Sequence, residues 1–212
     1  SHSFSGGAES NDENLINYLI SEGLEVKKAS CSSVTPSDIK RYDQIIVSNF
    51  THLSTECAAE LIRNKNFIIY EHDHKYVDTR DPSKFKGFQI PESRIVNKAF
   101  YENSVCTFVL SKICAEVLGN TLPRTLVYNI GCSLWSDETF NLLSETNKNE
   151  KTKDLCIMKN MNPTKNYLNT VQYCKSKNLE YGEIQPAGQL EFLTQMSQYK
   201  KLLFIPTVLE TF

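Results

Sequence analysis

The sequence lacks any run of apolar residues long enough to cross a membrane. A transmembrane helix needs about 20 consecutive apolar residues, and every apolar run here is much shorter and is interrupted by charged or amide side chains. The N-terminus also lacks the charged-then-apolar pattern of a secretory signal. We therefore expect no integral membrane segment, and we expect a cytoplasmic protein.

Paired cysteines and a strong net charge are also missing. The seven cysteines are odd in number and form no C-x-x-C pair, which favours neither a disulfide framework nor a zinc knuckle. The formal net charge is only -2, and the scattered Lys and Arg residues form no basic stripe that could follow a phosphate backbone. These absences predict a reducing compartment and no nucleic-acid partner.

What remains is an ordinary globular composition whose apolar runs alternate with segments of helical period. Hydrophobic residues make up 40% of the 212 positions, which is enough to close a core. Short apolar runs separated by helical segments predict βα units around parallel sheets, an α/β fold. The predicted strands are 44–48, 66–70, 106–110, 125–128, 155–158 and 202–205, and the predicted helices are 9–22, 55–63, 112–118, 165–177 and 190–199.

One stretch interrupts this alternation and predicts a domain boundary. Residues 141–154 carry many charged and polar side chains and few apolar ones, which is typical of a linker. We expect a first domain over residues 1–143, a linker at 144–153 and the start of a second domain at 154–212. An interior strand at 202–205 would need neighbours that the remaining residues do not supply. We therefore expect the chain to be a piece of a longer protein.

The Gly6-Gly7 pair precedes the first predicted helix. Glycines allow backbone amides to approach a ligand closely, and a helix N-terminus favours an anion or a hydroxyl group. The pattern is not G-x-G-x-x-G, so a nicotinamide-binding turn is not indicated. A plain helix-entry turn remains the alternative interpretation.

A cluster of ionisable residues, Glu71-His72-Asp73-His74, comes directly after a predicted buried strand. Side chains just past the carboxyl ends of parallel strands line the ligand crevice of an open sheet. His72 and His74 could there orient a hydroxyl nucleophile or a transferred sugar. Two alternatives stay open, namely a loop-capping role for Asp73 and a metal site, for which the sequence offers no distant third ligand.

Three more charged residues stand in loops after predicted strands. Lys159 and Lys165 bracket the first loop of the second domain, where two ammonium groups beside a helix N-terminus could hold a diphosphate. Glu210 follows the last predicted strand, again at the crevice edge. Solvated lysines and a capping carboxylate are the alternatives. The loop Tyr128-Asn129-Ile130-Gly131 is by itself only a turn.

In this order along the chain, the motifs resemble those of the retaining GT-B glycosyltransferases of the fourth family, also called group 1 glycosyltransferases. Leu24 stands where the family has His, and Ile130 is an insertion in an "x-N-G-V-D" turn. The segments that carry the resemblance are Ser5-Gly6-Gly7-Ala8-Glu9, 19–26, the loop at His72, 128–131, Lys159 with Lys165, and 189–212.

The resemblance implies two Rossmann-like domains, an acceptor-side domain and a nucleotide-sugar-binding domain of which the chain holds the start. It implies a hexosyl- or related glycosyltransferase of carbohydrate biosynthesis that transfers a sugar, with retention, from a nucleotide-diphosphate donor to a glycan, lipid or small-molecule acceptor. No cofactor and no metal are implied.

By the same resemblance, His72 or His74 places the acceptor or the sugar, and Glu210 contacts the donor sugar. Gly6, Gly7, Lys159 and Lys165 bind the donor diphosphate. The family's second glutamate would lie beyond the given residues, so the chain alone is expected to be inactive. A non-catalytic carbohydrate- or protein-binding module on the same fold, and a metal-dependent hydrolase, are the alternatives.

Overall fold

The computed structural model describes residues 7–64 and 66–210, which divide into two compact units. The N-terminal unit comprises residues 7–134 together with 209–210, and the C-terminal unit comprises residues 135–208. Each unit contains one parallel sheet with helices in its crossovers. The predicted α/β class with parallel sheets is therefore confirmed.

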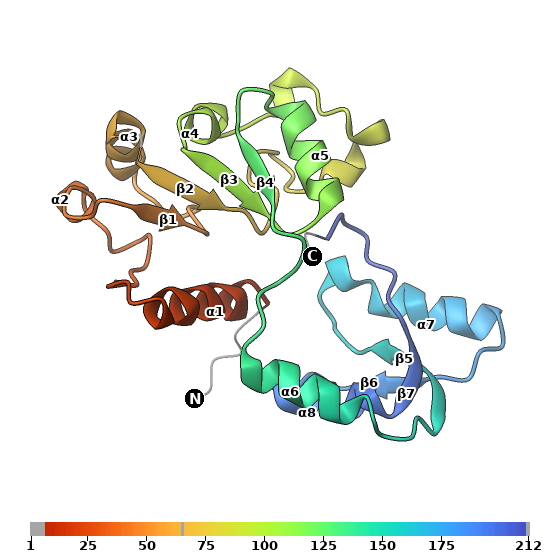
Figure 1. The fold of residues 1–212 in the computed structure, drawn as a ribbon. Helices are drawn as coiled ribbons and strands as arrows, with labels where there is room; N and C mark the ends of the chain where they lie inside the picture. Colours follow the sequence, from red (N-terminus) through yellow and green to blue (C-terminus); the bar gives the residue numbers. More distant parts are fainter. Residues whose placement is uncertain (1–6, 65, 211–212) are drawn as a thin grey trace. The chain divides into compact units, whose positions relative to one another are not determined.

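The N-terminal unit is built on a four-stranded parallel sheet with the order β1-β2-β3-β4. Its strands are Ile45–Val47 (β1), Phe67–Tyr70 (β2), Cys106–Val109 (β3) and Val127–Asn129 (β4). Its α-helices are Gly7–Ser21 (α1), Pro36–Ile39 (α2), Thr55–Asn64 (α3), Lys98–Glu102 (α4) and Lys112–Thr121 (α5). Figure 1 shows α3, α4 and α5 on one face of this sheet and α1 on the other.

Local sequence explains why these elements form where they do. The strand β2 is almost wholly buried, as its apolar sequence predicts for the interior of a parallel sheet. The helix α5 is capped by the Ser111 side chain, which accepts a hydrogen bond from the Cys114 amide. It buries Cys114, Val117 and Leu118, which helical periodicity places on one face.

Between β2 and α4 the chain makes three short 3₁₀ turns instead of a long helix. They are Pro82–Lys84 (η1), Lys86–Phe88 (η2) and Glu92–Arg94 (η3). Four non-glycine residues in this region have left-handed backbone angles, namely His74, Arg80, Phe88 and Asn97. Such conformations cost free energy in non-glycine residues and concentrate at functional sites. This segment is therefore the backbone-strained part of the N-terminal unit.

The C-terminal unit has a three-stranded parallel sheet with the order β6-β5-β7. The strands are Lys153–Met158 (β5), Gly182–Ile184 (β6) and Tyr199–Leu203 (β7). The helices are Asp137–Thr146 (α6), Tyr167–Ser176 (α7) and Gln189–Ser197 (α8), with a 3₁₀ turn at Pro163–Lys165 (η4). Cys156, Ile157, Cys174, Ile184 and Leu193 are its buried apolar residues.

Two elements of this unit were not predicted, and one strand is shifted. Strand β6 has only three residues, too few for a pattern of its own, and it forms because its residues pair with Cys156 to Met158 of β5. Helix α6 begins after the capping residue Ser136 and runs into the stretch of linker composition. The last strand lies at 199–203 rather than 202–205, because its pairing with β5 begins at Tyr199 opposite Lys153.

Within the described residues, no helix has both the length and the apolar character that a membrane crossing requires.

Candidate functional site

Three hydrogen-bonded side chains meet past the carboxyl ends of β1 and β2. Ser48 directly follows β1, His72 lies two residues after β2, and Asp12 belongs to α1. Asp12 Oδ2 accepts a hydrogen bond from Ser48 Oγ at 2.6 Å, and Asp12 Oδ1 lies 3.1 Å from His72 Nε2. This is the edge at which open parallel sheets bind ligands. We call these three residues the Asp12 cluster.

Asp12 orients the His72 imidazole. When Nε2–H donates to the carboxylate, the neutral ring carries its acceptor lone pair on Nδ1. The ring is also held edge-on against Tyr70, with ring centroids 4.4 Å apart. The Asp12 side chain is 25% exposed and that of His72 only 5%. The cluster thus reaches solvent through its carboxylate and fixes one imidazole in a defined orientation.

Two buried polar atoms lie next to this cluster. They are Asn11 Nδ2 and Tyr70 Oη, on side chains that are almost fully buried. Burial, and then the Asp12 carboxylate, raise the pKa of Tyr70, so its hydroxyl keeps its proton. Buried polar groups normally have a partner. Here a hydrogen bond with the Asn11 side chain opposes the rise in the pKa of Tyr70, so the two groups are neighbours beside Asp12.

A second, fully buried network fixes the loop that carries His72. Glu71 Oε1 accepts hydrogen bonds from Lys75 Nζ at 3.0 Å and from the Asp73 amide at 2.8 Å, and the Tyr101 hydroxyl donates to Glu71 Oε2. Burial alone would raise the pKa of Glu71, but the Lys75 ammonium and these hydrogen bonds hold it below its usual value. Glu71 is thus ionised and ties together both ends of the loop 71–75.

The surroundings of His74 differ from those of His72. Its Nδ1 lies 3.1 Å from the Tyr76 hydroxyl, and the residue is buried, with 2% of its surface exposed. Burial lowers the pKa of His74, against the opposing effects of Glu71, the Leu209 backbone and Asp81. His74 is therefore neutral near pH 7. The two predicted histidines lie on one loop, but only His72 belongs to the Asp12 cluster.

The predicted glycine site is described only in part. Gly6 lies outside the described residues. Gly7 is the first residue of α1, and a Cβ built on it would meet no atom within 4 Å, so packing does not require glycine there. At the turn after β4, Asn129 Oδ1 accepts a hydrogen bond from the Gly131 amide at 2.9 Å, and Gly131 has a φ of 88°. That loop is a side-chain-supported turn.

The two predicted phosphate-binding lysines both lie in the C-terminal unit, in the loop between β5 and α7. Lys159 Nζ lies 3.3 Å from Glu183 Oε2, and Glu183 also accepts a hydrogen bond from the Tyr167 hydroxyl. These contacts, the Tyr167 hydrogen bond first, lower the pKa of Glu183. Lys165 Nζ lies over the Phe204 ring, 5.6 Å from its centroid. Lys159 therefore already has a carboxylate partner.

The last predicted site residue, Glu210, has its backbone held in the N-terminal unit. The Leu209 amide donates a hydrogen bond to Asp81 Oδ1 at 3.2 Å, and Cys114 Sγ donates to the Glu210 carbonyl at 3.8 Å. His72, His74, Gly7 and Glu210 therefore belong to one unit, whereas Lys159 and Lys165 belong to the other. A shared site for the two groups stays a prediction.

Over residues 7–64 and 66–210, no group of three or more His, Cys, Asp or Glu side chains could hold a metal ion.

Sequence reasoning overlooked Asp12 and Ser48. A signal for Asp12 exists, because it stands four residues before Ile16 and seven before Leu19, on the apolar face of α1. A carboxylate on such a face needs a partner, and here Ser48 and His72 supply it.

Comparison with protein-family models, curated proteins and solved structures gives no match to this chain.

Proposed function

We propose that this chain is part of a retaining glycosyltransferase of the GT-B type, which transfers a sugar from a nucleotide-diphosphate donor to a hydroxyl acceptor. The observation that carries the proposal is the Asp12 cluster, which fixes a histidine at the ligand-binding edge of a parallel sheet. The order of the motifs along the chain supports it.

In this proposal the N-terminal unit handles hydroxyl groups. His72, oriented by Asp12, accepts a hydrogen bond from a hydroxyl of the acceptor or of the transferred sugar. The buried Glu71 network keeps the loop in place, so little free energy is lost in ordering it when a substrate binds.

The C-terminal unit supplies positive charge for the leaving diphosphate. Lys165 ends the turn η4, and Asn166, the N-cap of α7, has a left-handed backbone, so the ammonium group belongs to the residues at a helix N-terminus. Lys159 stands at the other end of the same loop. Two cations and a helix dipole stabilise a diphosphate most as its bond to the sugar breaks. Glu210 contacts the donor sugar in this proposal.

The test replaces His72 with Gln in the complete protein and measures sugar transfer from a panel of nucleotide-sugars. Loss of a positioned proton-transfer or hydrogen-bonding group lowers turnover by about 100-fold or more. His52→Gln is the matched control, because His52 is an exposed histidine in the loop after β1. Equal turnover of both variants and the unchanged protein would refute the role of His72, and no transfer from any donor would refute the proposed reaction.

A non-catalytic carbohydrate-binding module on the same fold is the second candidate. The pairing of Lys159 with Glu183 favours it, because a carboxylate 3.3 Å away already compensates the ammonium charge that a diphosphate would need. Calorimetry on the complete protein tests this candidate. Sugar binding without any turnover, with an affinity that Glu183→Gln leaves unchanged, would support the module and contradict the transferase.

A further inference from the structure

The N-terminal unit contains a cavity of about 380 Å³ that no part of the transferase proposal uses. It lies between α3, the loop after β1 and the strained segment 75–100. Apolar side chains form most of its wall, and two cationic side chains also line it, Lys75 and Arg80. The apolar wall consists of Phe50, Leu53, Ala58, Ile62, Val77, Val96 and Phe100. Apolar walls with a few polar groups are typical of small-molecule sites.

Lys75 is a buried ammonium group whose hydrogen-bonding capacity is incompletely used. Its side chain is only 2% exposed. An ammonium group has three N–H donors, and the one side-chain acceptor within hydrogen-bond distance in the described part of the chain is Glu71 Oε1 at 3.0 Å. Asp73 Oδ2 is 3.8 Å away, and the Phe50 ring centroid lies 5.6 Å from Nζ. An unsatisfied buried donor is costly, so an acceptor atom of a bound ligand would gain a hydrogen bond from Lys75.

Arg80 adds a positive charge that no carboxylate compensates. Its guanidinium donates a hydrogen bond to Thr51 Oγ1 at 2.7 Å, and within residues 7–64 and 66–210 it forms no ion pair. The carboxylate of Asp78, which also lines the cavity, is engaged by Arg94 at 2.8 Å. Arg80 has a φ of 52°, a conformation that costs free energy. Lys75 is paired with Glu71, so Arg80 is the cationic side chain of the lining that has no ion pair among the described residues.

The N-terminus of α3 also contributes partial positive charge to the cavity. Thr55, the first residue of this ten-residue helix, lines the cavity. The partial positive charge of a helix N-terminus favours an anion there. The buried Lys75, the uncompensated Arg80 and this helix end therefore favour one kind of occupant, with negatively charged oxygen atoms.

We propose that this cavity binds a small molecule that combines a carboxylate or phosphate group with an apolar portion. The oxyanion accepts hydrogen bonds from Lys75 and Arg80, and the apolar portion packs against Phe50 and Phe100, two contacting rings whose centroids are 4.7 Å apart. The proposal stands on the cavity and its charges, and it holds whether or not the chain belongs to a glycosyltransferase.

The experiment titrates the chain with phenylacetate, phenyl phosphate, inorganic phosphate and the uncharged 2-phenylethanol, while the amide NMR signals of Thr51, Thr55 and Arg80 are followed. At least one of the two aromatic anions is expected to shift these signals saturably and to bind about tenfold or more tightly than 2-phenylethanol. A preference for phenylacetate identifies a carboxylate ligand, and a preference for phenyl phosphate identifies a phosphate ester.

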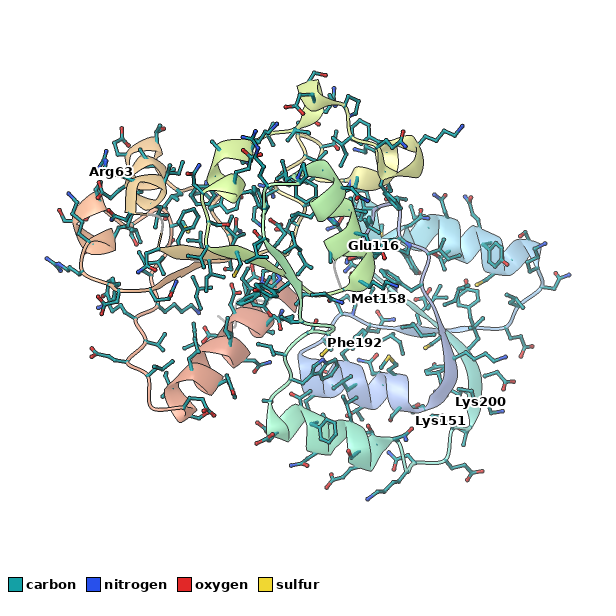
Figure 2. All side chains as sticks on the ribbon, turned by 45° about the horizontal axis from the view of Figure 1, so that its top comes forward. Arg63, Glu116, Lys151, Met158, Phe192 and Lys200 are labelled. Carbon is teal, nitrogen blue, oxygen red and sulfur yellow. The ribbon has the colours of Figure 1, made fainter. Side chains whose placement is uncertain are left out.

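Arg80→Gln is expected to weaken binding of the preferred anion by about tenfold or more, because it removes a charged donor. Arg63→Gln is the matched control, since Arg63 lies on α3 outside the cavity lining (Figure 2) and pairs with Glu60. The inference is overturned if neither aromatic anion shifts the three signals, or if 2-phenylethanol or inorganic phosphate binds as tightly as the aromatic anions. Equal affinities of Arg80→Gln and Arg63→Gln would overturn it as well.

Discussion

Replacing Lys75 by Met should destabilise the N-terminal unit severely, because it leaves Glu71 without its countercharge. Both side chains are only 2% exposed, and their charged atoms are 3.0 Å apart. Removing one partner of a buried ion pair typically costs about 3–5 kcal/mol, since the remaining charge can neither be hydrated nor paired. The Tyr101 hydroxyl and the Asp73 amide still donate to Glu71 in the variant, which favours the lower half of this range.

Native-state hydrogen exchange of the β2 amides measures this cost directly, because these amides lie in the centre of the sheet. A loss of about 3–5 kcal/mol corresponds to roughly 150- to 5,000-fold faster exchange. Lys98→Met is the matched control. It removes a lysine whose pair with Glu92, at 2.7 Å, is exposed on both sides. Exposed pairs of this kind contribute about 1 kcal/mol or less.

The double variant Glu71→Gln with Lys75→Met is expected to be more stable than Lys75→Met alone, because no unpaired charge is then buried. The pH dependence adds a second check. The lowered pKa of Glu71 stabilises the folded state above the unfolded pKa of about 4.3, and that stabilisation is lost as the pH falls through the lower folded pKa.

In Lys75→Met the burial of Glu71 remains and its partner is gone, so its folded pKa rises. The difference between the variant and the unchanged protein should therefore shrink as the pH falls from about 7 to about 4. A cost of Lys75→Met that equals the cost of Lys98→Met, at every pH in this range, would show that Glu71 and Lys75 are not a buried pair.

Two predictions concern the C-terminal unit. Gly182→Ala should cost about 1–3 kcal/mol, because the added Cβ overlaps the Tyr199 ring, and Tyr199→Leu in the same chain should recover most of the loss in urea unfolding. The hydrogen bond to Glu183 raises the pKa of Tyr167 to about 12. This stabilisation is present below the unfolded pKa of about 10 and is lost as the pH rises through the folded pKa. Glu183→Gln should bring the Tyr167 titration, followed by the Cζ NMR signal, back toward the unfolded value, and an unmoved titration would contradict the contact.

A second cavity, of about 240 Å³, lies in the C-terminal unit among α6, α8 and β7. Three lysines line it, Lys151, Lys200 and Lys201, of which Figure 2 labels the first two. Lys200 pairs with Asp154 at 2.7 Å, so its charge is compensated.

Chain-local signals determined most of the elements in this protein. The buried apolar run before Glu71 predicted β2, and the helical period of residues 112–118 predicted α5. Because His72 follows a predicted strand, the sequence also predicted that it lies at the ligand-binding edge. In a parallel sheet built from βα units all strands run in the same direction, so their carboxyl ends share one edge. Such signals are local because they depend on the conformation of a few consecutive residues.

Tertiary structure alone decided which side chains meet. Asp12 and His72 are 60 positions apart, and only the packing of α1 at the sheet edge brings their atoms within 3.1 Å. The same holds for Tyr101, which donates to Glu71 from α4. Contacts of this kind depend on how elements pack, which local periodicity does not encode. The sequence thus determined most of the elements and the edge, and folding decided that His72 has a carboxylate partner whereas His74 is buried and neutral.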